Sequence, residues 1–368
     1  MSSEIKMKRL LLCGQLLITN LCFANMASPV SQGTFSSSAF SSKDIDILKE
    51  KIHVTIDRSF KTAFYKIEYF INTESEGNQI PLLFFAMDYK GDFKVWVDDS
   101  EVIVSDIPAQ YLAAANSPFS NFTNIFSPPS QYEQSETVTI YWSENQGFVY
   151  QLNNLKYFES HLSKGKHTIR VEYEATVWTD VSGWIKEYGF RYSLSPAKFW
   201  KSFGSLEVVV DASHFQQSIT TNFNQPSSGK LDSVATWSFE NIPANYFQIN
   251  FVPEVSSLAN NLIQIGPDNL AYTFIFLIGL VHLFFIYKFR KNNLHRKLSW
   301  TLIVGSLIIP FLTLLFYMNS FGIIDSQIGA EAGRYHGYVF LNFIFYPVIV
   351  IVYFLVMWFL EKIIRRRF

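Results

Sequence analysis

A serine and a lysine near the middle of the chain have the spacing of a catalytic pair. Ser195 and Lys198 stand in an S-x-x-K sequence, which serine acyl-transfer enzymes use when a desolvated lysine amine takes the serine proton. Those enzymes place the pair at the start of a long helix and carry S-D-N and K-T-G motifs, which this sequence lacks. Pro196 follows the serine, and Gly204 precedes a strand-like pattern. We therefore favour a short helix that Ser195 caps and Gly204 ends.

Metal and cofactor chemistry has no recognisable motif in this sequence. The histidines include no H-E-x-x-H pair, and the acidic residues between Asp88 and Glu101 lack the spacing of a calcium loop. Both cysteines, Cys13 and Cys22, fall in an N-terminal segment that we expect to be removed, so the mature chain offers no thiolate. The sequence therefore predicts no metal site and no cofactor.

Two polar residues interrupt long apolar segments near the C-terminus. His282 lies in the first of these segments and Asn342 in the third. An ionisable group at membrane depth is by default a functional candidate, which makes a small transporter one alternative. A neutral histidine can also hydrogen-bond between helices, and we prefer that structural interpretation.

Four further candidates stand between the second and third apolar segments. We expect this stretch to be an external loop near the membrane surface, acting either as an interfacial segment or as a docking surface for the β-region. No catalytic motif accompanies its polar residues, which are Asp325, Glu331, Arg334 and His336.

Aromatic residues make up 17% of the chain. Exposed rings on a β-sandwich can stack on sugar faces, so a glycan-binding or peptidoglycan-binding module is an alternative function. The cores of such sandwiches also use aromatic residues, so exposure decides between the two interpretations. The tryptophans concerned are Trp96, Trp142, Trp178, Trp184 and Trp237.

The N-terminal 44 residues read as export and spacer segments. A basic start and a short, interrupted apolar run predict a cleaved signal peptide over residues 1–24. The Ser-rich residues 25–44 have little to bury, so we expect a flexible leader there.

Residues 45–254 show the two-residue period of half-buried strands. Short alternating stretches such as KIHVTID and GKHTIRVEYEA recur with turn residues between them, and no long helical period appears. This pattern predicts an all-β exported region of one or two antiparallel β-sandwiches. If there are two, we expect sub-domains at 45–110 and 134–254, separated by an irregular stretch.

Three apolar segments follow the β-region. Residues 270–287, 298–318 and 338–360 number 18, 21 and 23, enough to cross a hydrocarbon layer of about 30 Å as helices. We therefore expect a three-helix transmembrane region after the exported all-β region. The links between its helices are residues 288–297 and 319–337, and residues 361–368 form a tail.

Charge predicts the orientation of these helices. Residues 25–268 carry 17 basic and 27 acidic residues, whereas the 288–297 link and the 361–368 tail are strongly basic. By the positive-inside rule the link and the tail are cytoplasmic, and the β-region and the 319–337 loop lie outside. The basic residues that set this topology are Lys288, Arg290, Lys291, Arg296, Lys297, Arg365, Arg366 and Arg367.

These features predict a multi-pass protein of the bacterial inner membrane with its β-region in the periplasm. The cytoplasmic segments are too short for a nucleotide-binding or nucleic-acid-binding module. We therefore expect a non-enzymatic binding, scaffolding or sensory component of the cell envelope. Its expected partners are membrane lipid and another envelope or membrane protein. A Ser-Lys enzyme and a small transporter are lesser alternatives.

Overall fold

The computed structural model describes residues 34–111, 118–122, 125–126, 137–141, 147–297, 299–333, 336 and 339–366. It divides the chain into a β-rich unit, Ser31–Asp180 with Ile185–Pro253, and a helical unit, Glu254–Phe368 with Val181–Trp184. The predicted signal peptide, residues 1–24, lies outside the described residues.

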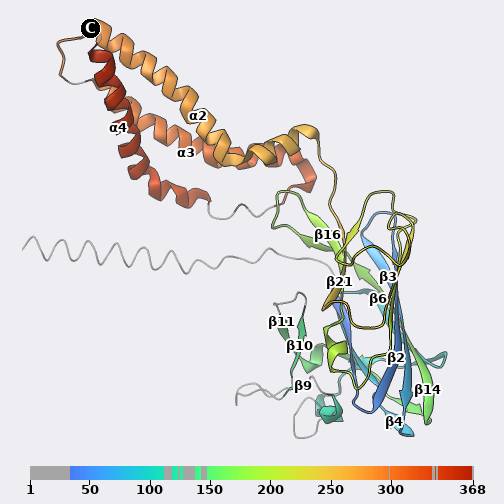
Figure 1. Cartoon of the computed structure of the whole chain (residues 1–368). Coiled ribbons are helices and arrows are strands. Elements are labelled where there is room, and N and C mark those ends of the chain that lie inside the picture. Colours follow the sequence, from blue (N-terminus) through green and yellow to red (C-terminus); the bar gives the residue numbers. More distant parts are fainter. Residues whose placement is uncertain are drawn as a thin grey trace, which may run out of the picture. The chain divides into compact units, whose positions relative to one another are not determined.

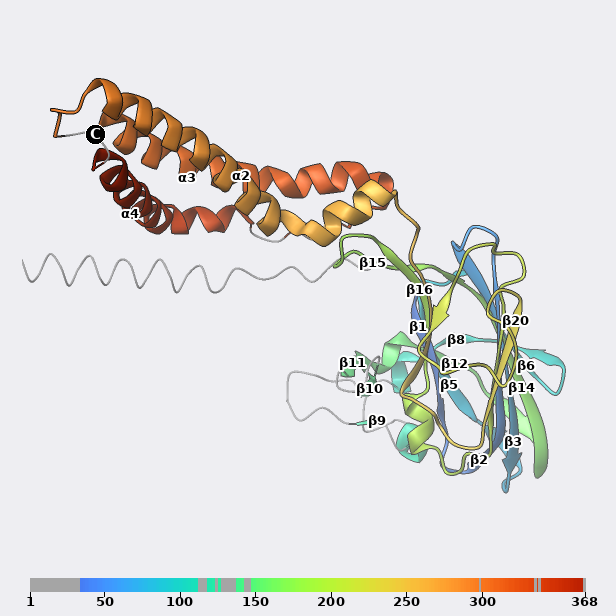
Figure 2. The same cartoon turned by 45° about the horizontal axis from the view of Figure 1, so that its top comes forward.

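Two eight-stranded sheets form the β-rich unit. Figure 1 shows β2, β3, β6 and β14 side by side in one layer and β16 and β21 in the other, and Figure 2 adds β1, β5 and β12 to the second layer. In order across the sheet, the first consists of β19 (Ser228–Gly229), β20 (Val234–Phe239), β17 (Leu206–Asp211), β2 (Ile45–Ile56), β3 (Thr62–Thr73), β14 (Gly165–Thr176), β6 (Lys90–Val97) and β7 (Ser100–Val102). The second consists of β18 (Thr220–Thr221), β21 (Tyr246–Phe251), β16 (Glu187–Ser193), β1 (Phe35–Ser41), β5 (Leu82–Met87), β12 (Leu155–Tyr157) and β8 (Ser105–Asp106), with β15 (Trp178–Asp180) paired to β16.

The two-residue period places one apolar face of each long strand in the core. In β2, for example, Ile52, Val54 and Ile56 are fully buried while the residues between them are partly exposed. The same alternation in β3 and β14 supplies most of the core between the two sheets. The predicted hairpin after Val97 is also confirmed, because Asp98 and Asp99 adopt positive φ angles of 47° and 63° and join β6 to β7.

The sheets are mixed, so the prediction of strictly antiparallel sandwiches is wrong. Strand β1 pairs in parallel with β16, and β2 pairs in parallel with β17. The chain passes from the second sheet to the first between β1 and β2, and again between β16 and β17. Both crossings lead from a strand of the second sheet to a strand of the first. As a result, β16 runs parallel to β1 and β17 runs parallel to β2.

The sequence boundary between two possible sub-domains has no counterpart in the fold. Strand β3 belongs to the 45–110 segment and β14 to the 134–254 segment, yet the two pair along their whole lengths. A single sandwich therefore contains both segments. Smaller strands pack at its side and end, namely β9 (Ile125–Phe126), β10 (Thr137–Tyr141), β11 (Gly147–Gln151), β4 (Gly77–Gln79) and β13 (Ser160–Leu162).

Part of the predicted flexible leader is a central strand. Residues Phe35–Ser41 form β1 between β5 and β16, and Ser37, Ser38 and Ser41 are buried there. Small side chains fit this position because both faces of the strand are covered: Ala39 contributes to the core between the sheets and Phe40 to a second core on the far side. Ser38 Oγ also donates to the carbonyl oxygen of Ser193 at 3.0 Å. Because this strand is Ser-rich and buried on both faces, its sequence has no alternation of apolar and polar residues that would indicate a strand.

The helical unit contains three helices long and apolar enough to cross a membrane. They are α2 (Ser257–Asn292), α3 (Trp300–Ile328) and α4 (Tyr346–Arg365), and α4 follows a 3-10 segment, η7 (Val339–Phe345). Both Figure 1 and Figure 2 show the three side by side over much of their length.

The helices extend beyond the predicted spans at several ends. Within α2, Gly266 has a φ of 71°, so a separate helical piece precedes Pro267, where the apolar part begins. Helix α3 continues past residue 318 and ends only at Gly329, which has a φ of 78°. Residues 319–328 are therefore helical rather than part of a loop.

Candidate functional site

The Ser195–Lys198 pair does not have the environment of a nucleophile and its base. Ser195 is buried, and its Oγ lies 2.9 Å from Ser193 Oγ. Lys198 is exposed, so it stays solvated, and its ammonium group donates to the side-chain oxygen of Asn245. The two side chains thus have different partners. The catalytic interpretation gains no support from this geometry.

The structural interpretation of this segment also needs correction. The helix is a single 3-10 stretch, Ser195–Phe199, whose N-cap is Leu194, and no side chain caps it. Gly204 does not end it either. A Cβ at Gly204 would lie 1.9 Å from the carbonyl oxygen of Leu48, so this glycine permits a close backbone approach to β2.

His282 joins all three long helices of the helical unit. Its Nε2 lies 3.0 Å from the Thr301 carbonyl oxygen on α3, and its Nδ1 lies 3.0 Å from the Tyr353 hydroxyl on α4. A carbonyl only accepts, so Nε2 carries the proton and Nδ1 accepts from the tyrosine. Both nitrogens of a neutral imidazole are thereby satisfied. This geometry is that of a structural histidine.

A buried ion pair lies closer to the basic end of the helices. Arg290 Nε on α2 lies 2.7 Å from Glu361 Oε1 on α4, and the two residues are 2% and 6% exposed. Arg290 also donates to the Arg296 carbonyl oxygen at 2.6 Å. Of the basic residues expected to set the topology, Arg290 therefore has a structural role within the helical unit. The other described ones are exposed: Lys288, Lys291, Arg296, Lys297, Arg365 and Arg366; Arg367 lies outside the described residues.

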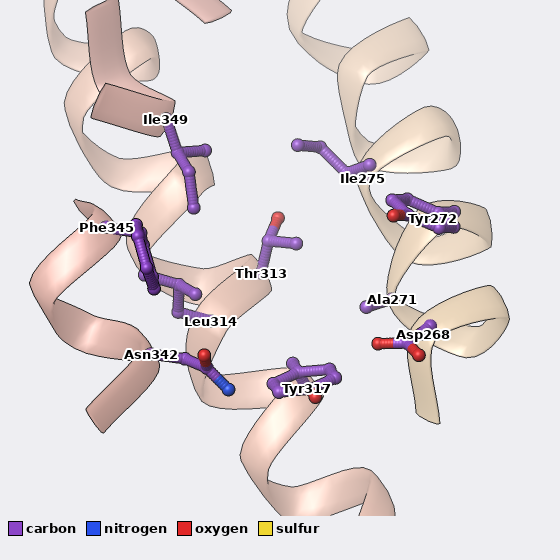
Figure 3. A pocket seen from close by; sticks show the side chains of 10 residues that line it. All are labelled: Asp268, Ala271, Tyr272, Ile275, Thr313, Leu314, Tyr317, Asn342, Phe345 and Ile349. Carbon is purple, nitrogen blue, oxygen red and sulfur yellow. The ribbon is translucent and has the colours of Figure 1, made fainter. Parts of the chain in front are cut away.

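A cavity of about 420 Å³ lies at the opposite end of the helices. Figure 3 shows its ten lining residues, which come from α2, α3, η7 and α4. We call it the Asp268 cavity. A smaller cavity of about 200 Å³, lined by Ser306 and six apolar residues of α3 and α4, provides a comparison and is called the Ser306 cavity.

Three of the five polar residues that line the Asp268 cavity gather at one end, whereas Thr313 lies near its middle and Tyr272 toward Ile275. Tyr317 lies within hydrogen-bonding range of both Asp268 and Asn342, and these three residues line the same end in Figure 3. The apolar side chains of Ile275 and Ile349 line the other end. The cavity is therefore amphipathic along its length, which suits a ligand with a polar head and an apolar tail.

Only one of these residues was a candidate from the sequence. Asn342 is a polar residue inside an apolar segment, and for that reason the sequence indicated it as a candidate. Asp268 sits at the start of such a segment, where an acidic residue is ordinary for a helix N-terminus, and Tyr317 sits near the end of one, where aromatic residues are common. Their convergence depends on how the helices pack, which no local pattern encodes.

The four candidates of the predicted external loop are only partly brought together. His336 Nε2 lies 2.7 Å from Asp325 Oδ1, and the His336 ring lies 4.6 Å from the ring of Trp184, which belongs to the helical unit. Glu331 ends a short 3-10 turn, Gly329–Glu331. Arg334 lies outside the described residues.

Four of the five tryptophans considered for glycan stacking are described, and none of these four is an exposed platform. Trp237 is buried, and Trp96 and Trp178 are half-buried with the guanidinium carbons of Arg170 and Arg191 at 4.4 and 3.6 Å from their rings. Trp184 is half-buried against Phe321 and His336, and Trp142 lies outside the described residues. The four described residues therefore give the glycan-binding alternative no support.

Among its described residues, the β-rich unit contains one fully buried carboxyl group. Burial raises the pKa of Glu50 from 4.5 to about 7, and hydrogen bonding to Tyr192 and Tyr69 offsets part of this rise. Tyr192 donates to Glu50 Oε1 at 2.9 Å, whereas Oε2 has no partner. The group lies in the core between the sheets. We therefore expect it to affect stability rather than chemistry.

A histidine on the surface resembles part of a catalytic triad but cannot act as a base. His167 Nδ1 lies 2.5 Å from Asp98 Oδ2, and Nε2 lies 2.7 Å from the Ser163 carbonyl oxygen. Both nitrogens thus donate, which is the arrangement of an imidazolium. Across the described ranges, no group of three or more His, Cys, Asp or Glu residues is placed to hold a metal ion.

Comparison with known proteins shows similarity only in structure. No known family matches the chain, and no curated protein is similar to it in sequence. Among solved structures, the chain resembles one from Legionella pneumophila described as a "putative nutrient binding protein", with 13% identity, a TM-score of 0.37, and coverage of 60% of this chain and 72% of that one.

Two peptidase-related structures are also similar. Leukotriene A4 hydrolase from Saccharomyces cerevisiae shows 8% identity and a TM-score of 0.30 over 63% of this chain and 32% of the enzyme. A variant of an M1 zinc metallopeptidase from Deinococcus radiodurans shows 8% identity and a TM-score of 0.25 over 57% and 43%. The chain spans less than half the length of these two proteins. All three TM-scores are below 0.5, so we draw no functional conclusion from them.

Proposed function

We propose that this protein is a non-enzymatic, membrane-anchored binding protein of the bacterial cell envelope that holds an amphiphilic ligand in the Asp268 cavity. The observation that carries the proposal is the cavity itself. It is of the size that small-molecule sites have, it lies between membrane-length helices, and Asp268, Tyr317 and Asn342 lie together at one end of it.

The position of the cavity along the helices supports a ligand that enters from the membrane. Asp268, His282 and Arg290 follow one another along α2, from its N-terminal part toward its C-terminal end. At 1.5 Å per residue, Asp268 lies about 33 Å from Arg290 along the helix, close to the roughly 30 Å of a hydrocarbon layer. The polar end of the cavity is then at one membrane surface and its apolar end is within the membrane.

The proposed orientation places that surface outside the cytoplasm. The exposed basic residues of the link and the tail lie close to Arg290 or further toward the same end of the helices, and the positive-inside rule puts them in the cytoplasm. The sandwich, whose segment of the chain is acidic, is then periplasmic in an inner-membrane protein exported by its signal peptide.

The non-enzymatic part of the proposal rests on the state of the reactive residues. Ser195 is buried, Lys198 is solvated, and both nitrogens of His167 are used as donors. His282, which a proton pathway would need to be free to titrate, bonds to two other helices. A binding role needs none of these groups to react.

Orientation can be tested by single cysteines in a variant that lacks Cys13 and Cys22. Asp232→Cys in the sandwich and His295→Cys in the basic link are both at exposed positions. In intact cells with a permeable outer membrane, an impermeant maleimide is expected to label residue 232 and not residue 295. The opposite pattern would show the proposed topology to be inverted.

Ligand binding can be tested by filling the cavity. Ile275→Trp places a large side chain in the Asp268 cavity, and Ile351→Trp makes the same change in the Ser306 cavity. Native mass spectrometry of the purified full chain is expected to detect a bound amphiphile in the wild type and in Ile351→Trp. The amphiphile should be absent from Ile275→Trp. Equal retention in both variants, or no bound amphiphile in the wild type, would contradict the proposal.

A further inference from the structure

We propose that the Asp268 cavity selects a primary ammonium head group and that its occupant is an ethanolamine phospholipid. This inference rests on the proposed binding function of the same cavity and adds the chemistry of the ligand. It is drawn from the charge, the donors and acceptors, and the apolar extent of the lining.

The charge of the lining calls for a cation. Asp268 is the only formally charged residue among the ten that line the cavity. In the part of the chain that the structure describes, no basic side chain forms a salt bridge with it. Its neighbour at the polar end is the neutral hydroxyl of Tyr317. A carboxylate at the edge of the membrane is stabilised when a cation shares the site.

The neighbouring groups favour an ammonium ion as that cation. Tyr272, Tyr317 and Phe345 bring three aromatic rings to the lining, and aromatic rings attract ammonium groups through their electron-rich faces. The Asn342 side chain turns its amide nitrogen toward Tyr317 and donates to the Tyr317 hydroxyl, which in turn faces the Asp268 carboxylate. The Asp268 carboxylate alone offers about four acceptor sites, so together with the Tyr317 hydroxyl it can accept the three hydrogen bonds that a primary ammonium donates.

The same acceptors distinguish ethanolamine from choline. A quaternary ammonium carries no N–H group, so it can use the aromatic rings but cannot donate to Asp268 or Tyr317. A phosphatidylglycerol head offers no cation and adds a net negative charge near Asp268. The expected affinity of the cavity is therefore highest for ethanolamine head groups, lower for choline head groups and lowest for glycerol head groups.

The apolar end of the cavity indicates that the ammonium belongs to a lipid. Ala271 and Ile275 continue the lining along α2 away from Asp268, and Leu314 and Ile349 line it from the other helices. From Asp268 to Ile275 the helix rises by about 10 Å. This length accommodates the first methylenes of acyl chains, whose remainder would stay in the bilayer. A small hydrophilic amine would leave this end unfilled.

The test measures lipid binding to the purified full chain in detergent. Phosphatidylethanolamine, phosphatidylcholine and phosphatidylglycerol with identical acyl chains are added in turn, and native mass spectrometry gives the bound fraction. The wild type is expected to prefer phosphatidylethanolamine over phosphatidylglycerol by about tenfold, the scale of one charge-assisted or cation–π contact. Asp268→Asn should remove the preference. Asp232→Asn, the same change at an exposed site of the sandwich, should keep it.

Tyr317→Phe and free ethanolamine complete the test. Tyr317→Phe keeps the ring but removes one acceptor, so it should weaken the preference without abolishing it, which covers the case in which Asp268→Asn does not fold. An unchanged preference in Asp268→Asn or in Tyr317→Phe would overturn the proposal. Displacement of the lipid by free ethanolamine would assign the site to a small amine and overturn the lipid assignment.

The two proposals fail in different ways. If all three lipids bind equally and Ile275→Trp abolishes their binding, the cavity is a lipid site without head-group selection, and only the ammonium inference is wrong. If no lipid binds in any variant, the proposed function is wrong as well.

Discussion

The imidazole of His282 on α2 lies between the carbonyl oxygen of Thr301 on α3 and the hydroxyl of Tyr353 on α4, at 3.0 Å from each. The His282 and Tyr353 rings are also stacked, with their centroids 5.8 Å apart. A glycine of α3 makes room for this arrangement, because a Cβ at Gly305 would lie 2.1 Å from His282 Nε2. One side chain thus fixes the packing of three helices.

The close approach of Gly305 to His282 gives the first prediction. Gly305→Ala is expected to destabilise the helical unit by about 1–3 kcal/mol, the usual range for overpacking. Gly322→Ala, on the same helix with open space around it, should be neutral or stabilising by up to about 1 kcal/mol because alanine favours helix. Reversible unfolding of the purified chain in detergent measures both. Equal effects of the two variants would contradict this account of Gly305.

The ion pair between Arg290 and Glu361 gives the second prediction. Glu361→Ala leaves a buried guanidinium without its counter-ion and should destabilise the chain by about 3 kcal/mol. Arg365→Ala, at an exposed position of the same helix, should change the stability by less than about 0.5 kcal/mol. The same unfolding measurement compares them. A small effect of Glu361→Ala would show that Arg290 finds other partners or reaches water.

The third prediction concerns the pH dependence set by Glu50. Its pKa is raised by burial from 4.5 to about 7, so the folded protein holds the proton more tightly than the unfolded chain. This contribution to stability is complete below pH 4.5 and is lost as pH rises to about 7, on the order of 3 kcal/mol. Glu50→Gln should flatten the stability profile of the sandwich over this interval. Glu101→Gln, at an exposed position of β7, should leave the slope as in the wild type, and a flat wild-type profile would refute the assignment.

The fourth prediction concerns the pH dependence set by His167. Burial alone would lower its pKa, but its hydrogen bonds to the Asp98 carboxylate and the Ser163 carbonyl raise the pKa above 6.5. The stabilisation is therefore complete below pH 6.5 and is lost as pH rises through the raised value. Asp98 is about half exposed, so we expect no more than about 1 kcal/mol. In an NMR titration of the imidazole, Asp98→Asn should lower the pKa of His167. An unchanged value would exclude the carboxylate as the cause.

The sequence predicted the parts of this structure that depend on local periodicity. The alternation in β2, β3 and β14, the hairpin at Asp98, and the three membrane-length helices all follow from short-range patterns of apolar residues. The strand Phe35–Ser41 was missed because its environment comes from β5 and β16, and a serine buried between them carries no apolar signal.

The candidate site was only partly visible for a similar reason. Asn342 stood out as an amide in an apolar segment, and His282 stood out in the same way although its bonds make it structural. Asp268 and Tyr317 looked ordinary at the ends of their segments. Their meeting with Asn342 depends on the register of three helices, which the residues of any one helix do not determine.

The most direct measurement is a high-resolution structure of the full chain in a bilayer disc that contains phosphatidylethanolamine. We expect head-group density within hydrogen-bonding distance of the Asp268 carboxylate, and acyl density continuing past Ile275 into the membrane. The same discs with Asp268→Asn should lack the ordered head group. A wild-type cavity that contains only water, with lipid bound elsewhere on the helices, would contradict the account.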